Sequence, residues 1–256
     1  QRNAIHYLSL YDNKLLRDFR GHSGEVTDLS MSPVDDSFMS VSTDRTVRMW
    51  NVQQAGCLAE LELPSNVEGF PHGCFDSTGL VFGVAAEMAA GSGHMVHLYD
   101  ARKYGGGAFA ELKLAQSSIE KAIHNQGIDP LKAMELSKVK WTSMNFNTSG
   151  KHLLVTAEKG LGLVLDGFDG SVSNVFVADG KDSNALPSHP LAACFTPDDK
   201  TVLVGNEDGT IGCWSAQSGK LQRKLEGHVE RVGCIAANPK YAQLASSCTN
   251  TALWLW

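Results

Sequence analysis

The chain has 256 residues, of which 43% are hydrophobic and 20% are charged, so it can bury a sizeable core and is not disordered by composition. Its formal net charge of −6 argues against general binding to nucleic-acid phosphates. Because no run of about 18 uninterrupted apolar residues occurs, we expect no membrane span, and we expect no signal peptide.

In chain order, the sequence predicts short β-strands separated by turn residues. Val, Leu, Thr and aromatic residues dominate the strands, and Gly, Asp, Asn or Pro separates them. No helical period of adequate length lies between them, which argues against alternating strands and helices. The predicted strands include residues 4–12, 14–19, 25–32, 38–43, 46–51, 57–63, 152–158, 161–166, 201–207, 210–215 and 252–256.

The four residues 21–24, GHSG, are close to the G-x-S-x-G elbow that carries the nucleophile of serine hydrolases. That elbow needs a glycine where Glu25 stands, and it needs a helix where this sequence predicts a strand. Other catalytic motifs are absent as well, including P-loop and zinc-protease patterns. We therefore expect Ser23 not to be a nucleophile and the protein not to be an enzyme.

The six cysteines include no pair in C-x-x-C spacing, and most lie in apolar, strand-like runs. Structural zinc sites commonly use spacing of that kind. The pattern predicts buried, reduced thiols in a cytosolic or nuclear protein, with no metal and no other cofactor.

The stretch that begins at Gly21 recurs at Gly227. Weaker copies lie between these two, and both a strand-closing aromatic residue and a hairpin turn mark a period of about 40 to 50 residues. That period is typical of the blade of a WD-repeat propeller. Seven positions correspond between the two copies: Gly21 with Gly227, His22 with His228, Val26 with Val232, Pro33 with Pro239, Ser40 with Ser246, Asp44 with Asn250 and Trp50 with Trp256. Ser23 does not recur, because Val229 stands at its position.

Resemblance to WD blades implies a structural role for the recurring polar residues. In such a blade the Gly-His histidine bonds to a turn aspartate, and a serine and an indole N–H complete the network. Here these would be His22, Asp44, Trp50 and either Ser40 or Ser42, since the two serines share one strand face. In the last unit they would be His228, Ser246, Asn250 and either Trp254 or Trp256.

We predict an all-β fold, a WD-repeat β-propeller with five to six blades in this sequence and seven in the complete protein. Residues 1–256 would form a single propeller domain that is N-terminally incomplete, because the first and last units both supply the third strand of a blade. Residues 115–138 form a longer interval of weak helical tendency, interrupted by Gly127 and Pro130. They would be a flexible surface insertion or a partner-binding excursion.

A closer resemblance lies in four stretches: IHYLSLYDNKLLRDFRGH, LSMSPVDDSFMS, FTPDDKTVLVGNEDGTI and NPKYAQLASSCTNTALWLW. They resemble the WD-repeat subunit shared by the COMPASS histone-lysine methyltransferase complex and by complexes that end RNA polymerase II transcription. These include the cleavage and polyadenylation factor and a nuclear phosphatase assembly. The resemblance covers nearly the whole chain except residues 85–94 and 115–138.

This resemblance implies a non-catalytic nuclear scaffold that docks peptide segments of the methyltransferase complex and of mRNA 3′-end processing and termination complexes. Contact with RNA polymerase II would be indirect, without sequence-specific nucleic-acid binding. In peptide-binding WD proteins, contacts often come from the residue before the turn aspartate; Thr43, Glu207 and Thr249 match that position, and Thr27 lies in the same ring. The alternative is an adaptor of another assembly, such as a ubiquitin-ligase substrate receptor or a ribosome-assembly factor.

Overall fold

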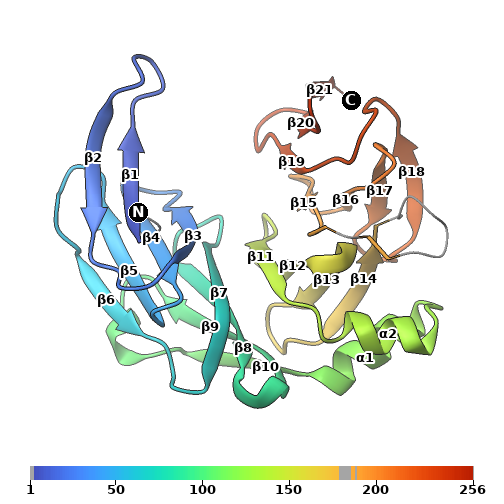
Figure 1. The fold of residues 1–256 in the computed structure, drawn as a ribbon, viewed down its shortest axis with the longest axis horizontal. Coiled ribbons are helices and arrows are strands. Elements are labelled where there is room, and N and C mark those ends of the chain that lie inside the picture. The colour runs from blue at the N-terminus through green and yellow to red at the C-terminus, as the bar shows by residue number, and fades with distance from the viewer. Residues whose placement is uncertain (1–2, 179–185, 188, 256) are drawn as a thin grey trace. The chain divides into compact units, whose positions relative to one another are not determined.

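A computed structural model describes residues 3–178, 186–187 and 189–255, and these residues form mainly antiparallel β-sheets (Figure 1). Each sheet is a meander in which strands consecutive in the chain are paired. This is the topology of propeller blades, and it confirms the predicted all-β fold class. Within the described residues there are four four-stranded sheets, one of three strands and one of two, so five to six blades are present.

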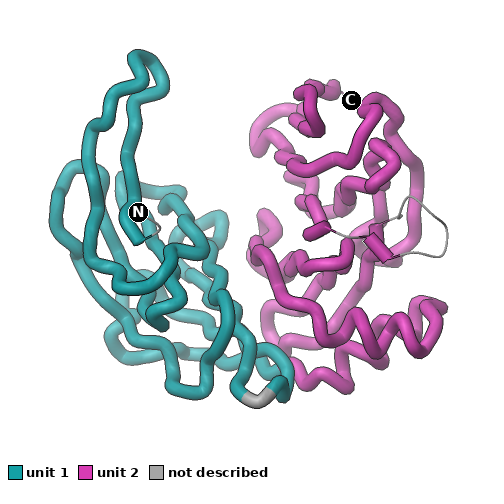
Figure 2. Tube along the Cα trace, viewed as in Figure 1, with its two compact units in different colours: residues 1–113 teal, residues 114–256 magenta. Residues whose placement is uncertain are grey.

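The chain divides into two compact units, residues 1–113 and 114–256, which we describe separately (Figure 2). That residues 1–256 form one propeller domain therefore stays a prediction. The first unit holds β1 (Ala4–Leu8) and β2 (Leu15–Arg20); β3 (Val26–Met31), β4 (Ser37–Ser42), β5 (Thr46–Asn51) and β6 (Ala59–Glu62); and β7 (Val67–Phe75), β8 (Val81–Met88), β9 (Gly93–Asp100) and β10 (Ala110–Ala115), the last of which crosses the boundary.

The second unit contains three further sheets and the helical insertion. Its strands are β11 (Trp141–Phe146), β12 (His152–Ala157), β13 (Leu161–Asp166) and β14 (Val172–Val177); β15 (Ala193–Phe195), β16 (Thr201–Gly205), β17 (Ile211–Ser215) and β18 (Leu221–Leu225); and β19 (Cys234–Ala237), β20 (Gln243–Ser247) and β21 (Thr251–Leu255). Single 3₁₀ turns occupy Ala89–Gly91, Tyr104–Gly106 and Glu158–Gly160.

The central strands of the sheet β3–β6 are buried on both faces, because a different sheet covers each face. On one face Phe38 and Trp50 pack against Phe19 of β2. On the other, Met39 and Val41 join a core that includes Phe82 of β8. Strand side chains alternate between faces, so a continuous buried run such as that of β4 requires cover on both sides.

The sheet β15–β18 of the second unit is enclosed in the same way. Val202 and Val204 of β16 pack toward Leu154 and Val164 of the preceding sheet. Leu203, between them in sequence, joins the opposite core with Ile211, Cys213, Val232, Ile235 and Leu244. The sheets β3–β6 and β15–β18 thus each depend on both of their neighbours for their cores, as expected for stacked repeats.

The insertion is a helical hairpin, which corrects the expectation of a flexible segment. Helix α1 (Gln116–Asn125) and helix α2 (Pro130–Leu136) bury Ile119, Ile123, Ala133 and Leu136. Gly127 and Pro130, which we took as interruptions, are the signals that shape the hairpin. Gly127 adopts a left-handed φ of 82° just after α1, and Pro130 opens α2 behind the cap Asp129, whose carboxylate accepts the Leu131 and Lys132 amides.

All six cysteines are free thiols, but the expectation of general burial is wrong for Cys57 and Cys234, which are exposed. None of the helices described is long and apolar enough to span a membrane.

Candidate functional site

The polar residues predicted to lock a blade meet in the sheet β3–β6. The Trp50 Nε1–H donates to Ser40 Oγ over 2.8 Å, Ser40 Oγ lies 2.7 Å from His22 Nε2, and His22 Nδ1 lies 2.9 Å from Asp44 Oδ2. Ser42 stays outside this chain and instead accepts the Asp44 amide. Of the two serines that sequence left open, the structure therefore selects Ser40.

The direction of donation along this network follows from its two ends. An indole nitrogen only donates, and an ionised carboxylate only accepts. Burial lowers the pKa of His22 despite the nearby Asp44, so the imidazole is neutral at pH 7 and carries its proton on Nδ1. Partial burial opposes ionisation of Asp44, but hydrogen bonds from Thr46, His22 and the Ser23 amide outweigh it and hold its pKa well below its usual range.

Ser23 supplies only its backbone to this arrangement, donating its amide N–H to Asp44 Oδ2 over 2.9 Å. The chain continues into β3 rather than into a helix. The strand-to-helix elbow that a serine hydrolase needs is therefore absent at this position. His22 and Asp44 are committed to fixing the turn between β4 and β5 against the segment before β3.

A second network in the sheet β19–β21 contains Trp254, one of the two tryptophans left open, and differs from the prediction at one residue. Trp254 Nε1–H donates to Ser246 Oγ over 2.7 Å, and Ser246 Oγ lies 2.7 Å from His228 Nε2. Trp256, the residue that pure repetition predicts, lies outside the described residues. His228 Nδ1 faces Cys248 Sγ at 3.1 Å, so Cys248 and not Asn250 holds the place of the turn aspartate.

A difference in hairpin register explains both assignments. Ten positions separate Ser40 from Trp50, whereas eight separate Ser246 from Trp254. Ser40 pairs with Arg48, eight positions along the chain, whereas Ser246 pairs with Ala252, six positions along, so the residues after this hairpin are displaced relative to the first repeat. Asn250 contributes its amide N–H, which donates to Cys248 Sγ over 3.3 Å; this bond lowers the pKa of the Cys248 thiol.

The recurring glycine before each histidine has a packing reason. A Cβ placed on Gly227 would lie 2.5 Å from Trp254 Cη2, and one on Gly21 would lie 3.3 Å from Trp50 Cη2. The backbone before the histidine thus passes close to the indole, tightly at Gly21 and so closely at Gly227 that a Cβ would clash.

The sheet β7–β10 replaces this polar network with apolar packing. Tyr99 takes the position of the tryptophan and stacks on Phe82 with ring centroids 4.9 Å apart, while buried Val84 stands where Ser40 would be. Exchanging both partners of a buried hydrogen bond for apolar groups is nearly neutral in free energy. The repeat period can therefore be recognised in this part of the sequence, although the polar residues of the network are absent from it.

Two of the four predicted peptide-contact residues, Thr27 and Thr43, lie in the first unit. The Thr27 hydroxyl is directed to the carbonyls of Val41 and of Pro71 in β7, so it ties neighbouring sheets together. Thr43 Oγ1 accepts the Glu25 amide at 2.9 Å and remains partly exposed at the turn between β4 and β5.

The other two, Glu207 and Thr249, lie in the second unit and differ in exposure. The Glu207 side chain is only 10% exposed, and its Oε1 lies 3.4 Å from His189 Nδ1. Thr249 is exposed beside Cys248 in the turn between β20 and β21. Of the four residues, Thr249 is exposed and the other three are partly exposed.

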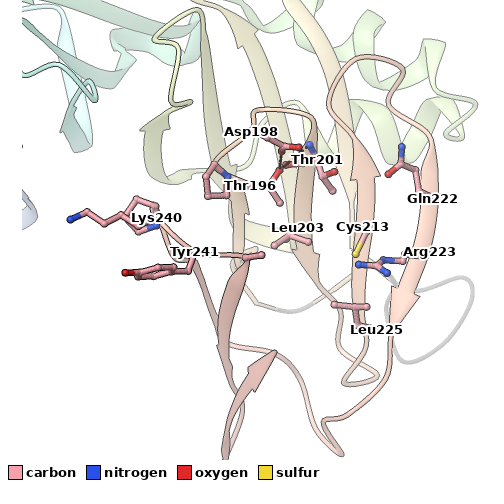
Figure 3. Close-up of a pocket in the computed structure, with 13 residues that line it drawn as sticks. Thr196, Asp198, Thr201, Leu203, Cys213, Gln222, Arg223, Leu225, Lys240 and Tyr241 are labelled. Carbon is pink, nitrogen blue, oxygen red and sulfur yellow. Dashed lines mark hydrogen bonds between the residues drawn. The ribbon is translucent and has the colours of Figure 1, made fainter. Parts of the chain in front are cut away.

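A separate groove of about 470 Å³ lies between the sheets β15–β18 and β19–β21 (Figure 3). Leu203, Cys213 and Leu225 line it on one side, and the turn of Pro239, Lys240, Tyr241 and Ala242 lines it on the other. No local sequence signal marks this groove, because its walls come from strands and turns far apart in the chain. Within the described residues, no group of three or more His, Cys, Asp or Glu side chains is placed to hold a metal ion.

The chain is similar to one family of repeats and, along most of its length, to several known proteins. Residues 13–51, 180–215 and 219–256 match the family described as WD domain, G-beta repeat. WD repeat-containing protein 82 of Drosophila melanogaster is 33% identical over 99% of this chain and 70% of its own length. Protein ANTHESIS POMOTING FACTOR 1 of Arabidopsis thaliana is 32% identical over 98% of this chain and 66% of its own length. COMPASS component SWD2 of Saccharomyces cerevisiae is 30% identical over 95% of this chain and 68% of its own length.

Proposed function

This chain belongs to the WD-repeat family that includes WD repeat-containing protein 82 and COMPASS component SWD2, and we propose that it is a non-catalytic subunit of a COMPASS-type histone-lysine methyltransferase complex. The observation that carries the proposal is similarity to SWD2 along 95% of the chain. A second relative, Set1 complex component swd2 of Schizosaccharomyces pombe, is 28% identical over 80% of the chain.

The geometry of the blades supports a scaffold rather than an enzyme. His22, Ser40 and Asp44, the residues closest to a catalytic triad, are satisfied by one another and by Trp50. A buried network with all its partners fixes local structure and contributes more than its isolated pairs. Rigid sheets that present turns at their ends are suited to hold extended segments of other proteins.

We propose that Thr43 and Thr249 contact such segments, with Glu207 as a more enclosed third contact. Thr27 would help to position the surface around Thr43, since its hydroxyl joins β3 to the backbone of β7. As a further part of the proposal, residues 1–256 belong to one propeller domain. The chain would act in the nucleus, and it would also join cleavage and polyadenylation or phosphatase complexes that link it indirectly to RNA polymerase II.

Affinity purification of the tagged chain from nuclear extract, with mass spectrometry of what is retained, tests this function. A SET-domain methyltransferase and its companion subunits are the expected result, with 3′-end processing subunits in a separate fraction. Recovery of neither would overturn the proposal. A cullin ligase or a pre-ribosomal particle in their place would support the alternative adaptor role.

A matched pair of variants tests the peptide contacts. Thr43→Arg adds bulk and charge at the turn between β4 and β5, whereas Gln53→Arg makes the same kind of change at the exposed turn after β5, at the other end of the sheet. Thr43→Arg should reduce methyltransferase recovery several-fold, and Gln53→Arg should not. Equal recovery with both variants would exclude Thr43 from the interface.

A further inference from the structure

The groove between the sheets β15–β18 and β19–β21 combines an apolar floor with an inward-pointing cation. We propose that it docks an extended acidic peptide, in which an apolar side chain sits on the floor and a carboxylate two residues along pairs with Arg223. The inference deepens the proposed scaffold function and rests on it, because it names the chemistry of one segment that this subunit would hold.

Sheet register builds the floor and the cationic wall as one row. Leu203 of β16 pairs with Cys213 of β17, and Cys213 pairs with Arg223 of β18. Paired residues in neighbouring strands point to the same face of a sheet. Leu203 and Cys213 are each 3% exposed, whereas Arg223 at the outer strand is exposed. Across β16, β17 and β18, this row therefore passes from two apolar side chains to the Arg223 guanidinium.

The Arg223 guanidinium is directed into the groove, beside Cys213, as Figure 3 shows. Within the described residues, no ion pair joins Arg223 to an acidic side chain. A guanidinium presents a planar fork of donors that matches a carboxylate in two parallel hydrogen bonds. An aspartate or glutamate of a partner is the complementary group.

The acidic groups at the edge of the groove already have partners. Asp198 accepts the Thr196 hydroxyl over 2.6 Å and the Lys200 amide over 3.2 Å. Asp199, its neighbour, accepts the amides of Thr148 and Ser149. These carboxylates hold turns in place, and among the described residues neither forms an ion pair with Arg223.

The opposite wall is a turn fixed by its own hydrogen bonds. Asn238 Oδ1 accepts the amides of Lys240 and Tyr241, and the Asn238 amide N–H donates to the Gln243 carbonyl. In Figure 3, Lys240 and Tyr241 extend their side chains away from Arg223, so the mouth of the groove stays open. At about 470 Å³ its volume is in the range of ligand sites, and a wall fixed in advance reduces the ordering cost of binding.

An extended chain suits this layout because residues i and i+2 point to the same side of a strand. One such pair spans the step from the apolar floor to the guanidinium.

The test uses the full chain and fluorescein-labelled peptides of the form Ser-Ser-X-Ser-Z-Ser-Ser, measured by fluorescence polarisation. X is Leu, Met or Phe, and Z is Glu or Gln. Glutamate peptides should bind about tenfold more tightly than their glutamine counterparts, and the difference should shrink as salt increases. Equal binding of both sets, or no binding of any member, would overturn the proposal.

Arg223→Gln and Lys224→Gln form a matched pair, since both remove one positive charge from β18. Strand alternation places Lys224 on the opposite face of the sheet. Arg223→Gln should weaken glutamate-peptide binding about tenfold and Lys224→Gln less than about twofold. An equal loss in both variants would refute a specific site.

Charge exchange provides a gain-of-function check. Arg223→Glu should prefer a peptide with Lys at position Z, and wild type should not. Unchanged circular dichroism spectra and melting temperatures establish that these variants fold. If the peptides fail while methyltransferase subunits still co-purify with the chain, the groove proposal is wrong and the scaffold function stands.

Discussion

Replacing Trp50 with alanine tests the central claim that the tryptophan and histidine are architectural. The Trp50 side chain is completely buried and joins two sheets of the first unit. Its ring centroid lies 5.6 Å from that of Phe19 in β2 and 6.3 Å from that of Phe38 in β4. Its indole N–H is also the first donor of the network that ends at Asp44.

The expected loss is about 3 to 5 kcal/mol of unfolding free energy, the usual range for removing a buried tryptophan side chain. Most of it comes from lost apolar burial and from the cavity between Phe19 and Phe38. About 1 kcal/mol comes from the lost hydrogen bond to Ser40, whose hydroxyl then loses a buried donor. Trp50→Phe keeps much of the apolar contact but removes the donor, so it should lie between wild type and Trp50→Ala.

Urea unfolding followed by far-UV circular dichroism measures these differences without depending on tryptophan fluorescence. Ser23→Ala is the control, because Ser23 contributes its amide and not its side chain to Asp44. It should change the unfolding free energy by less than about 0.5 kcal/mol. Equal midpoints for Trp50→Ala and Ser23→Ala would refute the structural assignment of the network.

Three further predictions concern other parts of the chain. Burial lowers the pKa of His94 from 6.5 to about 4, so the unfolded state takes up the proton first as the pH falls. The unfolding free energy should therefore fall by about 3 kcal/mol between pH 6.5 and pH 4. Urea titrations should show a shallower fall with pH in His94→Gln, and the same pH dependence in both proteins would contradict this. Cys248 should react with iodoacetamide at pH 7.5 at least threefold faster than the exposed Cys234, as read by peptide mass spectrometry, because the Asn250 amide donates to its sulfur and lowers its pKa. Equal rates would argue against that stabilisation. Ile123→Ala in α1 should lower the unfolding free energy by about 2 to 5 kcal/mol, because Ile123 is buried. Leu131→Ala on the exposed side of α2 should lower it by under about 0.5 kcal/mol. If the insertion were flexible, neither variant would lose stability.

The sequence alone was sufficient for the sheets and for His22, Asp44 and Trp50 of the first polar network. Strand periodicity, turn residues and a repeated Gly-His are local signals, and each survives in the structure around His22, Asp44 and Trp50. The insertion was less readable because Gly127 and Pro130 have two meanings. Within a helix they are breakers, but between two helices they form a turn and an N-terminus.

Only the tertiary structure showed which residues of each repeat take part in the hydrogen-bond networks. Ser40 and Ser42 share a strand face, so period alone cannot separate them, and the position of the His22 ring does. The register of the β20–β21 hairpin differs from that of β4–β5, so the tryptophan of the second network is Trp254, and Cys248 rather than Asn250 faces His228. The groove at Arg223 likewise exists because register aligns three strands beside a turn from the next sheet. Local sequence determines which residues are strand or turn, whereas side-chain partnership depends on register and packing between segments distant in the chain.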